Sequence, residues 1–137
     1  MEQILRRDFV NRDVWGVVEH GAEMIVVTVR IQVSPENKAE ARRVILPLLG
    51  PTRAEAGCVS CDLYTSAEDD SSMVLVERWK SMPDLERHIR SDHYRNVLAW
   101  IDMSTEPPAV HFDSLSKSQG LELIVAIRDG RNQVSAS

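Results

Sequence analysis

The chain has 137 residues, of which 43% are hydrophobic and 27% are charged, and its formal net charge is -5. This length suits one domain, and the apolar content is typical of a folded globular protein rather than a disordered chain. The acidic balance, with a pI near 5.3, argues against a nucleic-acid-binding surface, which needs a basic stripe.

The sequence shows no pattern typical of membrane insertion or export. No stretch approaches the roughly 20 apolar residues that a membrane span requires. The N-terminal segment MEQILRRDFVNRD carries charges where a signal peptide needs an apolar core. We therefore expect a cytosolic protein with no nucleic-acid or membrane partner, whose two cysteines are reduced.

The first predicted core element is a strand at residues 24–33, MIVVTVRIQV, which is rich in β-branched residues. Its alternation places Val27, Val29 and Ile31 on one face and polar residues on the other. This face is therefore predicted to lie against the core.

A helix is predicted to follow this strand. Ser34 is a candidate N-cap, and Pro35 takes the first helical position, where its missing N–H costs nothing. Pro47 lies inside the apolar helical pattern, and an interior proline costs about 3 kcal/mol. We expect a kink or an early end there, with the bent helix finishing near Glu55.

Two strands and a second helical region come next. Gly57 turns the chain, and the polar run SAEDDSS joins a strand at residues 58–65 to a strand at residues 73–80. Ser81 then opens a helix that is predicted to break at Ser91–Asp92. Its apolar face is predicted from Leu85, Ile89, Val97, Leu98 and Ile101.

A last core strand is predicted at residues 109–115, so the order of elements is βαββαβ. This order predicts an α+β, ferredoxin-like domain at residues 24–115, with an antiparallel sheet and helices on one face. Neither face of the two central hairpin strands alternates cleanly with polar residues, which indicates that both faces are covered. We therefore expect a homodimer that pairs sheet to sheet.

Two segments lie outside this predicted domain. Residues 1–23 form an N-terminal extension with several apolar side chains, and residues 116–137 form a C-terminal arm and tail. The segment GLELIVAIR at residues 120–128 is predicted to be a further strand, which could swap onto a partner subunit.

Five sequence features occur in an order that is specific to one fold family. They are the MIVVTVRI strand, Glu55-x-Gly57-Cys58, Tyr64 at the end of the second strand, Glu77-x-Trp79 at the end of the third, and His93–Tyr94 in the last helix. Through these five features, the chain resembles the antibiotic-biosynthesis-monooxygenase family of small dimeric α+β barrels, over about residues 24–115.

The resemblance implies a homodimer that inserts oxygen from O2 into a small aromatic, quinol or anthrone-like substrate with no bound cofactor. The family also contains haem-degrading enzymes and isomerases of signal molecules, and fold alone does not decide between them. The haem-degrading branch has an asparagine where this chain has Val29 and a histidine near Leu98, so that activity is not expected. An isomerase or degrading enzyme for a small oxygenated signal molecule, and a non-catalytic small-molecule-binding dimer, remain alternatives.

Oxidation without flavin or metal makes the substrate the reductant, so the protein must supply a base, an apolar pocket and orienting hydrogen bonds. His93 is the preferred base because an imidazole titrates near neutral pH. Glu77 is the second candidate for handling protons, and Trp79 is a candidate wall for a planar substrate. The remaining candidates for substrate binding are Tyr64, Tyr94, His88 and Val29.

Each candidate also has a structural interpretation. Trp79 could be a core residue, His93 a helix cap, and each tyrosine a structural hydrogen-bond donor. Glu77 could pair with an arginine, for which the candidates are Arg78, Arg87 and Arg30.

The cysteine pattern does not predict a metal or redox site. Cys58 and Cys61 have the spacing of a redox motif, but they lie on a predicted strand, where positions i and i+3 face opposite sides. No second cysteine pair completes a zinc site. We expect buried, inert thiols and no metal, and His111 on the last strand is expected to be structural.

Overall fold

The computed structural model describes residues 23–130. Its elements are β1 (Met24–Gln32), the 3-10 turn η1 (Pro35–Asn37), α1 (Lys38–Arg53), β2 (Cys58–Thr65), β3 (Ser72–Trp79), α2 (Met82–Arg90), α3 (Tyr94–Ile101), β4 (Ala109–Leu115) and α4 (Leu121–Arg128). The predicted order βαββαβ is confirmed up to β4. The proposed extension at residues 1–23 lies, but for residue 23, outside the described residues, as does the tail at residues 131–137.

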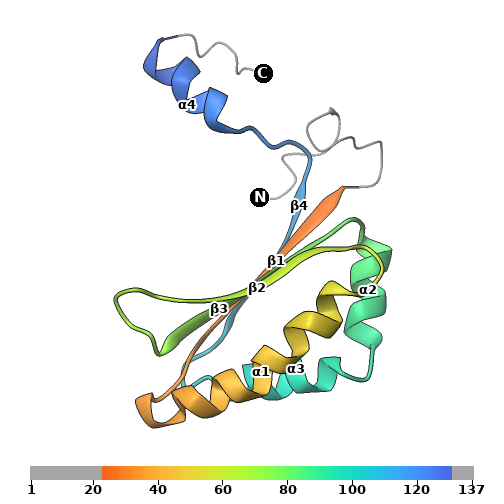
Figure 1. The fold of residues 1–137 in the computed structure, drawn as a ribbon, viewed down its shortest axis with the longest axis vertical. Helices are drawn as coiled ribbons and strands as arrows, with labels where there is room; N and C mark the ends of the chain where they lie inside the picture. The colour runs from red at the N-terminus through yellow and green to blue at the C-terminus, as the bar shows by residue number, and fades with distance from the viewer. Residues whose placement is uncertain (1–22, 131–137) are drawn as a thin grey trace.

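The strands form an antiparallel sheet in the order β2-β3-β1-β4, with β1 and β3 at its centre. Helices α1, α2 and α3 cover one face of this sheet, and α4 extends away beyond β4 (Figure 1). The predicted α+β, ferredoxin-like class is thus confirmed. None of the helices in residues 23–130 is long and apolar enough to cross a membrane.

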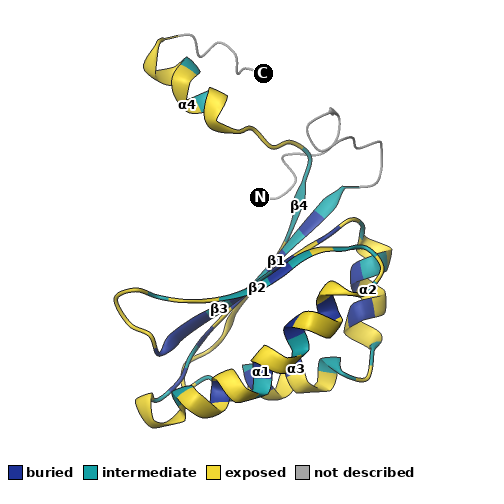
Figure 2. Ribbon diagram, viewed as in Figure 1, coloured by how far each residue is buried: buried dark blue, intermediate teal, exposed yellow. Residues whose placement is uncertain are grey.

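The core lies between the sheet and the three helices. Alternate residues of β1 and β3 point into it, and Val29 pairs with Leu75 across the two strands. Ile45 of α1 and Trp100 of α3 are fully buried in the same core. Buried positions lie along the strands and on the helices that cover them (Figure 2). The period-2 pattern of the strands therefore predicted the buried face of the sheet correctly.

Helix α1 passes Pro47 and finishes close to the predicted end near Glu55, so the alternative of an early end at Pro47 is wrong. It runs from Lys38 to Arg53, through both Pro47 and Pro51. Pro47 is exposed, whereas Ile45 and Leu49 are buried on the face toward the sheet. Burial of that face offsets the roughly 3 kcal/mol cost of an interior proline, because packing routinely overrides local propensity.

The predicted break after α2 is confirmed, but part of the predicted apolar face is wrong. Ile89 and Leu98 are exposed, and His88 and Trp100 are buried instead. The break rotates α3 relative to α2, so one helical period cannot be continued from one helix to the other.

The segment at residues 120–128 is a helix, α4, and the predicted C-terminal strand is wrong. A strand needs a sheet edge to satisfy its backbone groups, whereas a helix satisfies them within the segment. The apolar side chains that suggested a strand, Leu121, Ile124 and Ile127, are exposed.

Strand β2 contains a bulge that changes which way its cysteines face. Cys58 pairs with Trp79 and Cys61 pairs with Glu77, with the register shifting between Cys58 and Ser60. Because the bulge adds one residue, both cysteines face the helices. The prediction that they face opposite sides is therefore wrong.

Candidate functional site

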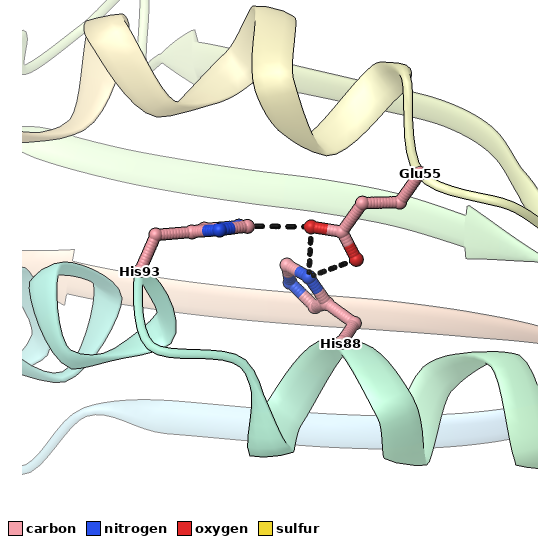
Figure 3. A group of neighbouring side chains, drawn as sticks. All are labelled: Glu55, His88 and His93. Atoms are coloured by element: carbon pink, nitrogen blue, oxygen red, sulfur yellow. Dashed lines mark hydrogen bonds and ion pairs between the residues drawn. The ribbon is translucent and has the colours of Figure 1, made fainter.

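Three polar side chains meet between the sheet and the helices. Glu55 lies between His88 and His93, and its carboxylate faces both imidazoles (Figure 3). His88 Nδ1 is 3.0 Å from each carboxylate oxygen, and His93 Nε2 is 2.8 Å from Oε2. The His93 contact has the distance of an ion pair, although its direction is not that of a hydrogen bond.

The turn after α1 places Glu55. Gly57 has a φ of 87°, which is the left-handed region that favours glycine. A Cβ atom at this position would clash with the side chain of Asp84. Asp84 lies in the first turn of α2, capped by Ser81, so Gly57 lets the turn approach this helix end closely. Glu55 is thereby held opposite α2.

The break between α2 and α3 brings the two histidines together. In one continuous helix, residues five apart point about 140° away from each other. Here α2 ends at Arg90, and His93 lies at the N-cap of α3. Ser91 Oγ donates a hydrogen bond to the carbonyl of His88 at 2.6 Å, which stabilises the end of α2. Both imidazoles can therefore face Glu55.

A second carboxylate lies behind His88. Trp79 Nε1 donates a hydrogen bond to Glu77 Oε1 at 2.9 Å, and His88 Nε2 is 3.6 Å from Glu77 Oε2. The rings of Trp79 and His88 are stacked, with centroids 4.7 Å apart. We call the five residues Glu55, His88, His93, Glu77 and Trp79 the acid–histidine network.

The carboxylates of this network change the pKa values of the buried side chains next to them. Burial alone would lower the pKa of His88, but the negative charges of Glu77 and Glu55 outweigh it and raise the pKa above its usual 6.5. Tyr94 packs edge-on against the His88 ring, with centroids 5.2 Å apart. Burial and the charge of Glu77 raise the pKa of Tyr94 above 10.0, so its hydroxyl stays protonated at neutral pH.

The structure assembles most of the residues that the sequence singled out, but not all. Glu77, Trp79, His88, His93 and Tyr94 lie together, as described above. Two others lie elsewhere.

Tyr64 and Val29 are not part of this group. Tyr64 pairs with Val74, on the sheet face away from the helices, and is 56% exposed. Val29 is buried in the core beside Leu75. Its apolar side chain contributes packing rather than a polar contact, so the predicted roles of both residues in substrate binding are not supported.

The structure corrects the predicted ion pair of Glu77 and the predicted role of Trp79. Within residues 23–130, Glu77 contacts Trp79 and His88 and forms no ion pair with an arginine. Arg30 instead donates to Ser72, and Arg87 pairs with Asp84. Trp79 is fully buried under His88, so its indole does not form an open wall for a substrate.

Glu55 is the site residue that sequence reasoning missed. The sequence pattern indicates Glu55 only as part of the Glu55-x-Gly57-Cys58 turn. A carboxylate directly before a turn glycine gives no local sign of its partners, because His88 and His93 lie more than thirty residues later.

The cysteines next to this network are predicted to react slowly. Burial and the charge of Glu77 raise the pKa of Cys58 to about 11 and that of Cys61 to about 12. A pKa of about 11 in place of 9.0 lowers the thiolate fraction at pH 8 about 100-fold. Iodoacetamide should therefore modify native Cys58 about 100-fold more slowly than the unfolded chain, with Cys61 slower still and both rates rising toward pH 11. Mass spectrometry of a time course checks this, and fast native modification at pH 8 would contradict it.

The sheet order and this network define an α+β, ferredoxin-like protein with a partly buried acid–histidine site. The model of the antibiotic biosynthesis monooxygenase family matches residues 24–100, more than half of the chain. The chain therefore belongs to this family.

Relatives with known sequences and structures agree with this assignment. Putative monooxygenase Rv0793 of Mycobacterium tuberculosis is 39% identical over 87 residues, which is 63% of this chain and 85% of that protein. Its solved structure has a TM-score of 0.62 at 34% identity and covers 72% of this chain and 98% of its own. Putative monooxygenase YcnE of Bacillus subtilis is 29% identical over 56% of this chain and 80% of its own length. A conserved protein from Methanosarcina mazei shares the fold, with a TM-score of 0.63 at 25% identity over 69% of this chain and 94% of its own. The family and these relatives support a monooxygenase-like function.

Proposed function

We propose that this protein oxidises a small aromatic, quinol or anthrone-like compound with O2 and without a bound cofactor. The observation that carries this proposal is the position of Glu55 between two histidines, one buried and one partly exposed. Glu55 fixes the orientation of the partly exposed imidazole, which can then remove a proton from a substrate.

His93 is the proposed base. Its side chain is 29% exposed, whereas His88 is fully buried, so a substrate can reach His93 first. Glu55 orients the His93 ring and stabilises it when it takes up a proton. The substrate anion left behind is electron-rich and can pass an electron to O2.

The substrate supplies all the electrons that this reaction needs. For an anthrone, the CH2 group becomes a carbonyl: one oxygen atom of O2 enters that carbon and the other leaves as water with the two hydrogens. No external reductant is required. The protein therefore has to remove the first proton and to orient the substrate.

Glu77 acts through His88 in this scheme, as a positioning residue. It was predicted to handle substrate protons directly, but it is only 3% exposed and lies behind His88. Its contacts to Trp79 Nε1 and His88 Nε2 hold the imidazole that faces Glu55. Tyr94 packs against the same ring and fixes its orientation.

Oxygen uptake tests the proposal. Purified, metal-free protein is given a panel of reduced naphthoquinones and anthrones, and uptake is compared with the autoxidation of each compound alone. We expect protein-dependent uptake with at least one class of substrate. Uptake at the autoxidation rate throughout would contradict the proposal, and turnover of a ligand without oxygen would favour an isomerase.

We also propose that two copies pair through the sheet face away from the helices. That face carries the partly exposed side chains Val26, Val74 and Val76, with Tyr64 beside them. Arg30, Asp62 and Arg78 lie among them on the same face. This mixture of apolar and charged side chains has the composition of many protein–protein interfaces. The homodimer and the cytosolic location expected from the sequence both remain predictions.

Light scattering of the full-length chain checks the dimer. Val76→Asp places a charge in the proposed interface and is expected to shift the mass from dimer to monomer. Leu98→Asp is the matched control, because Leu98 is 51% exposed on α3, away from that face. A monomeric native chain, or a dimer that Val76→Asp leaves intact, would contradict this interface.

A further inference from the structure

We propose that Glu55, His88 and His93 form a binding site for one divalent transition-metal ion, such as Zn²⁺, Co²⁺ or Ni²⁺. The ligands are a carboxylate oxygen of Glu55, Nδ1 of His88 and Nε2 of His93. This inference goes beyond the proposed oxidation and does not depend on it.

The geometry of the three donor atoms fits one ion. All three lie within 4.8 Å of one another. His88 Nδ1 is 3.0 Å and His93 Nε2 is 2.8 Å from the same oxygen, Glu55 Oε2. Ligand atoms bonded to one zinc ion at about 2.0–2.1 Å lie roughly 3.0–3.5 Å apart. The two imidazole nitrogens are up to 4.8 Å apart. The partly exposed His93 ring therefore has to swing toward His88 by about 1 Å to complete the site.

The donor set suits a divalent metal ion of intermediate softness, such as Zn²⁺. Two imidazoles and one carboxylate are the ligands of many zinc and other transition-metal sites, and three protein ligands leave a position open for water or another ligand.

The surroundings of His88 resemble the outer shell of a metal site. A histidine that binds a metal through one nitrogen usually offers the other nitrogen to a carboxylate, which fixes the ring. His88 Nδ1 faces Glu55, and its Nε2 lies 3.6 Å from Glu77 Oε2. Glu77 is in turn held by Trp79, and the His88 ring is stacked on the Trp79 indole.

The site has a buried floor and two partly exposed side chains at its rim. His88 is buried at its floor, whereas the side chains of Glu55 and His93 are 21% and 29% exposed. An ion bound there would replace Glu55 as the partner of His93 Nε2 and withdraw electron density from the ring, which makes the imidazole a weaker base. Metal binding is therefore expected to inhibit that oxidation rather than to support it.

Isothermal titration calorimetry tests the site, using the chelator-treated full-length protein with Zn²⁺ and no substrate. We expect one ion per chain, with Co²⁺ giving the visible absorption of a low-coordinate complex. Glu55→Gln and His93→Ala should each weaken Zn²⁺ binding at least 100-fold. Glu77→Gln should weaken it about 10–100-fold, as the loss of an outer-shell carboxylate does.

Glu40→Gln is the matched control for Glu55→Gln, because Glu40 is exposed in the first turn of α1 and forms an ion pair with Arg43. Circular dichroism confirms that each variant is folded. Binding that Glu55→Gln and His93→Ala leave unchanged, or no binding at stoichiometric protein concentrations, overturns the site. Because no substrate or oxygen is needed, this result is independent of whether the protein is an oxygenase.

Discussion

Replacing Trp79 by alanine is expected to lower the free energy of unfolding by about 3–5 kcal/mol. Trp79 is one of the largest fully buried side chains, so truncation leaves a cavity beneath His88. It also removes the hydrogen bond that the indole donates to the buried carboxylate of Glu77. Urea unfolding, followed by circular dichroism, measures the loss.

A pair of milder substitutions separates packing from hydrogen bonding. Trp79→Phe and Trp100→Phe make the same chemical change at two fully buried positions. The N–H of Trp79 donates to Glu77, whereas the Nε1 of Trp100 has no hydrogen-bond partner among the described residues. Trp79→Phe should therefore cost about 1–3 kcal/mol more than Trp100→Phe, because it leaves a buried acceptor unpaired. Equal losses would mean that the contact to Glu77 contributes nothing to stability.

Replacing His93 by alanine is expected to lower protein-dependent oxygen uptake about 10²–10⁴-fold, the usual contribution of a general base. The loss should fall mainly on kcat, because His93 is assigned to proton removal rather than to substrate affinity. Stability should change little, since the His93 side chain is partly exposed and lies at a helix end. Oxygen-electrode kinetics and thermal unfolding measure the two effects side by side.

Glu40→Gln is the control for this variant, because Glu40 is exposed in the first turn of α1, and it should keep wild-type uptake. Lost stability in His93→Ala, with uptake reduced only in proportion to the unfolded fraction, would point to a structural histidine. Uptake in His93→Ala at the wild-type rate would remove His93 as the base and direct attention to Glu55 as the more exposed of the two carboxylates.

The order of strands and helices along the sequence was enough to predict the ferredoxin-like core. The alternation in β1 and β3 predicted which residues face the helices, and Ser91–Asp92 predicted the break between α2 and α3. These features depend on neighbours within a few residues, and local sequence determines them directly. Glu77, Trp79, His88 and His93 were recognised for the same reason, as reactive or aromatic groups beside clear core positions.

Other features depend on contacts between distant segments, and only the tertiary structure decided them. Helix α1 stays a single helix through Pro47 because its buried face packs on the sheet, so the early end that the proline allowed does not occur. Residues 120–128 form helix α4, which satisfies its backbone hydrogen bonds within the segment instead of pairing with an edge strand. The bulge in β2 turns Cys58 and Cys61 to the same side.

The clearest case is Glu55. In the sequence, Glu55 is only an acidic residue before a turn. In the structure, the close approach of Gly57 to Asp84 places Glu55 between His88 and His93. The sequence by itself therefore determined the layers of this protein and most of its candidate polar groups. The tertiary structure decided which of them touch, because their convergence depends on how the turn, the two helices and the sheet pack together.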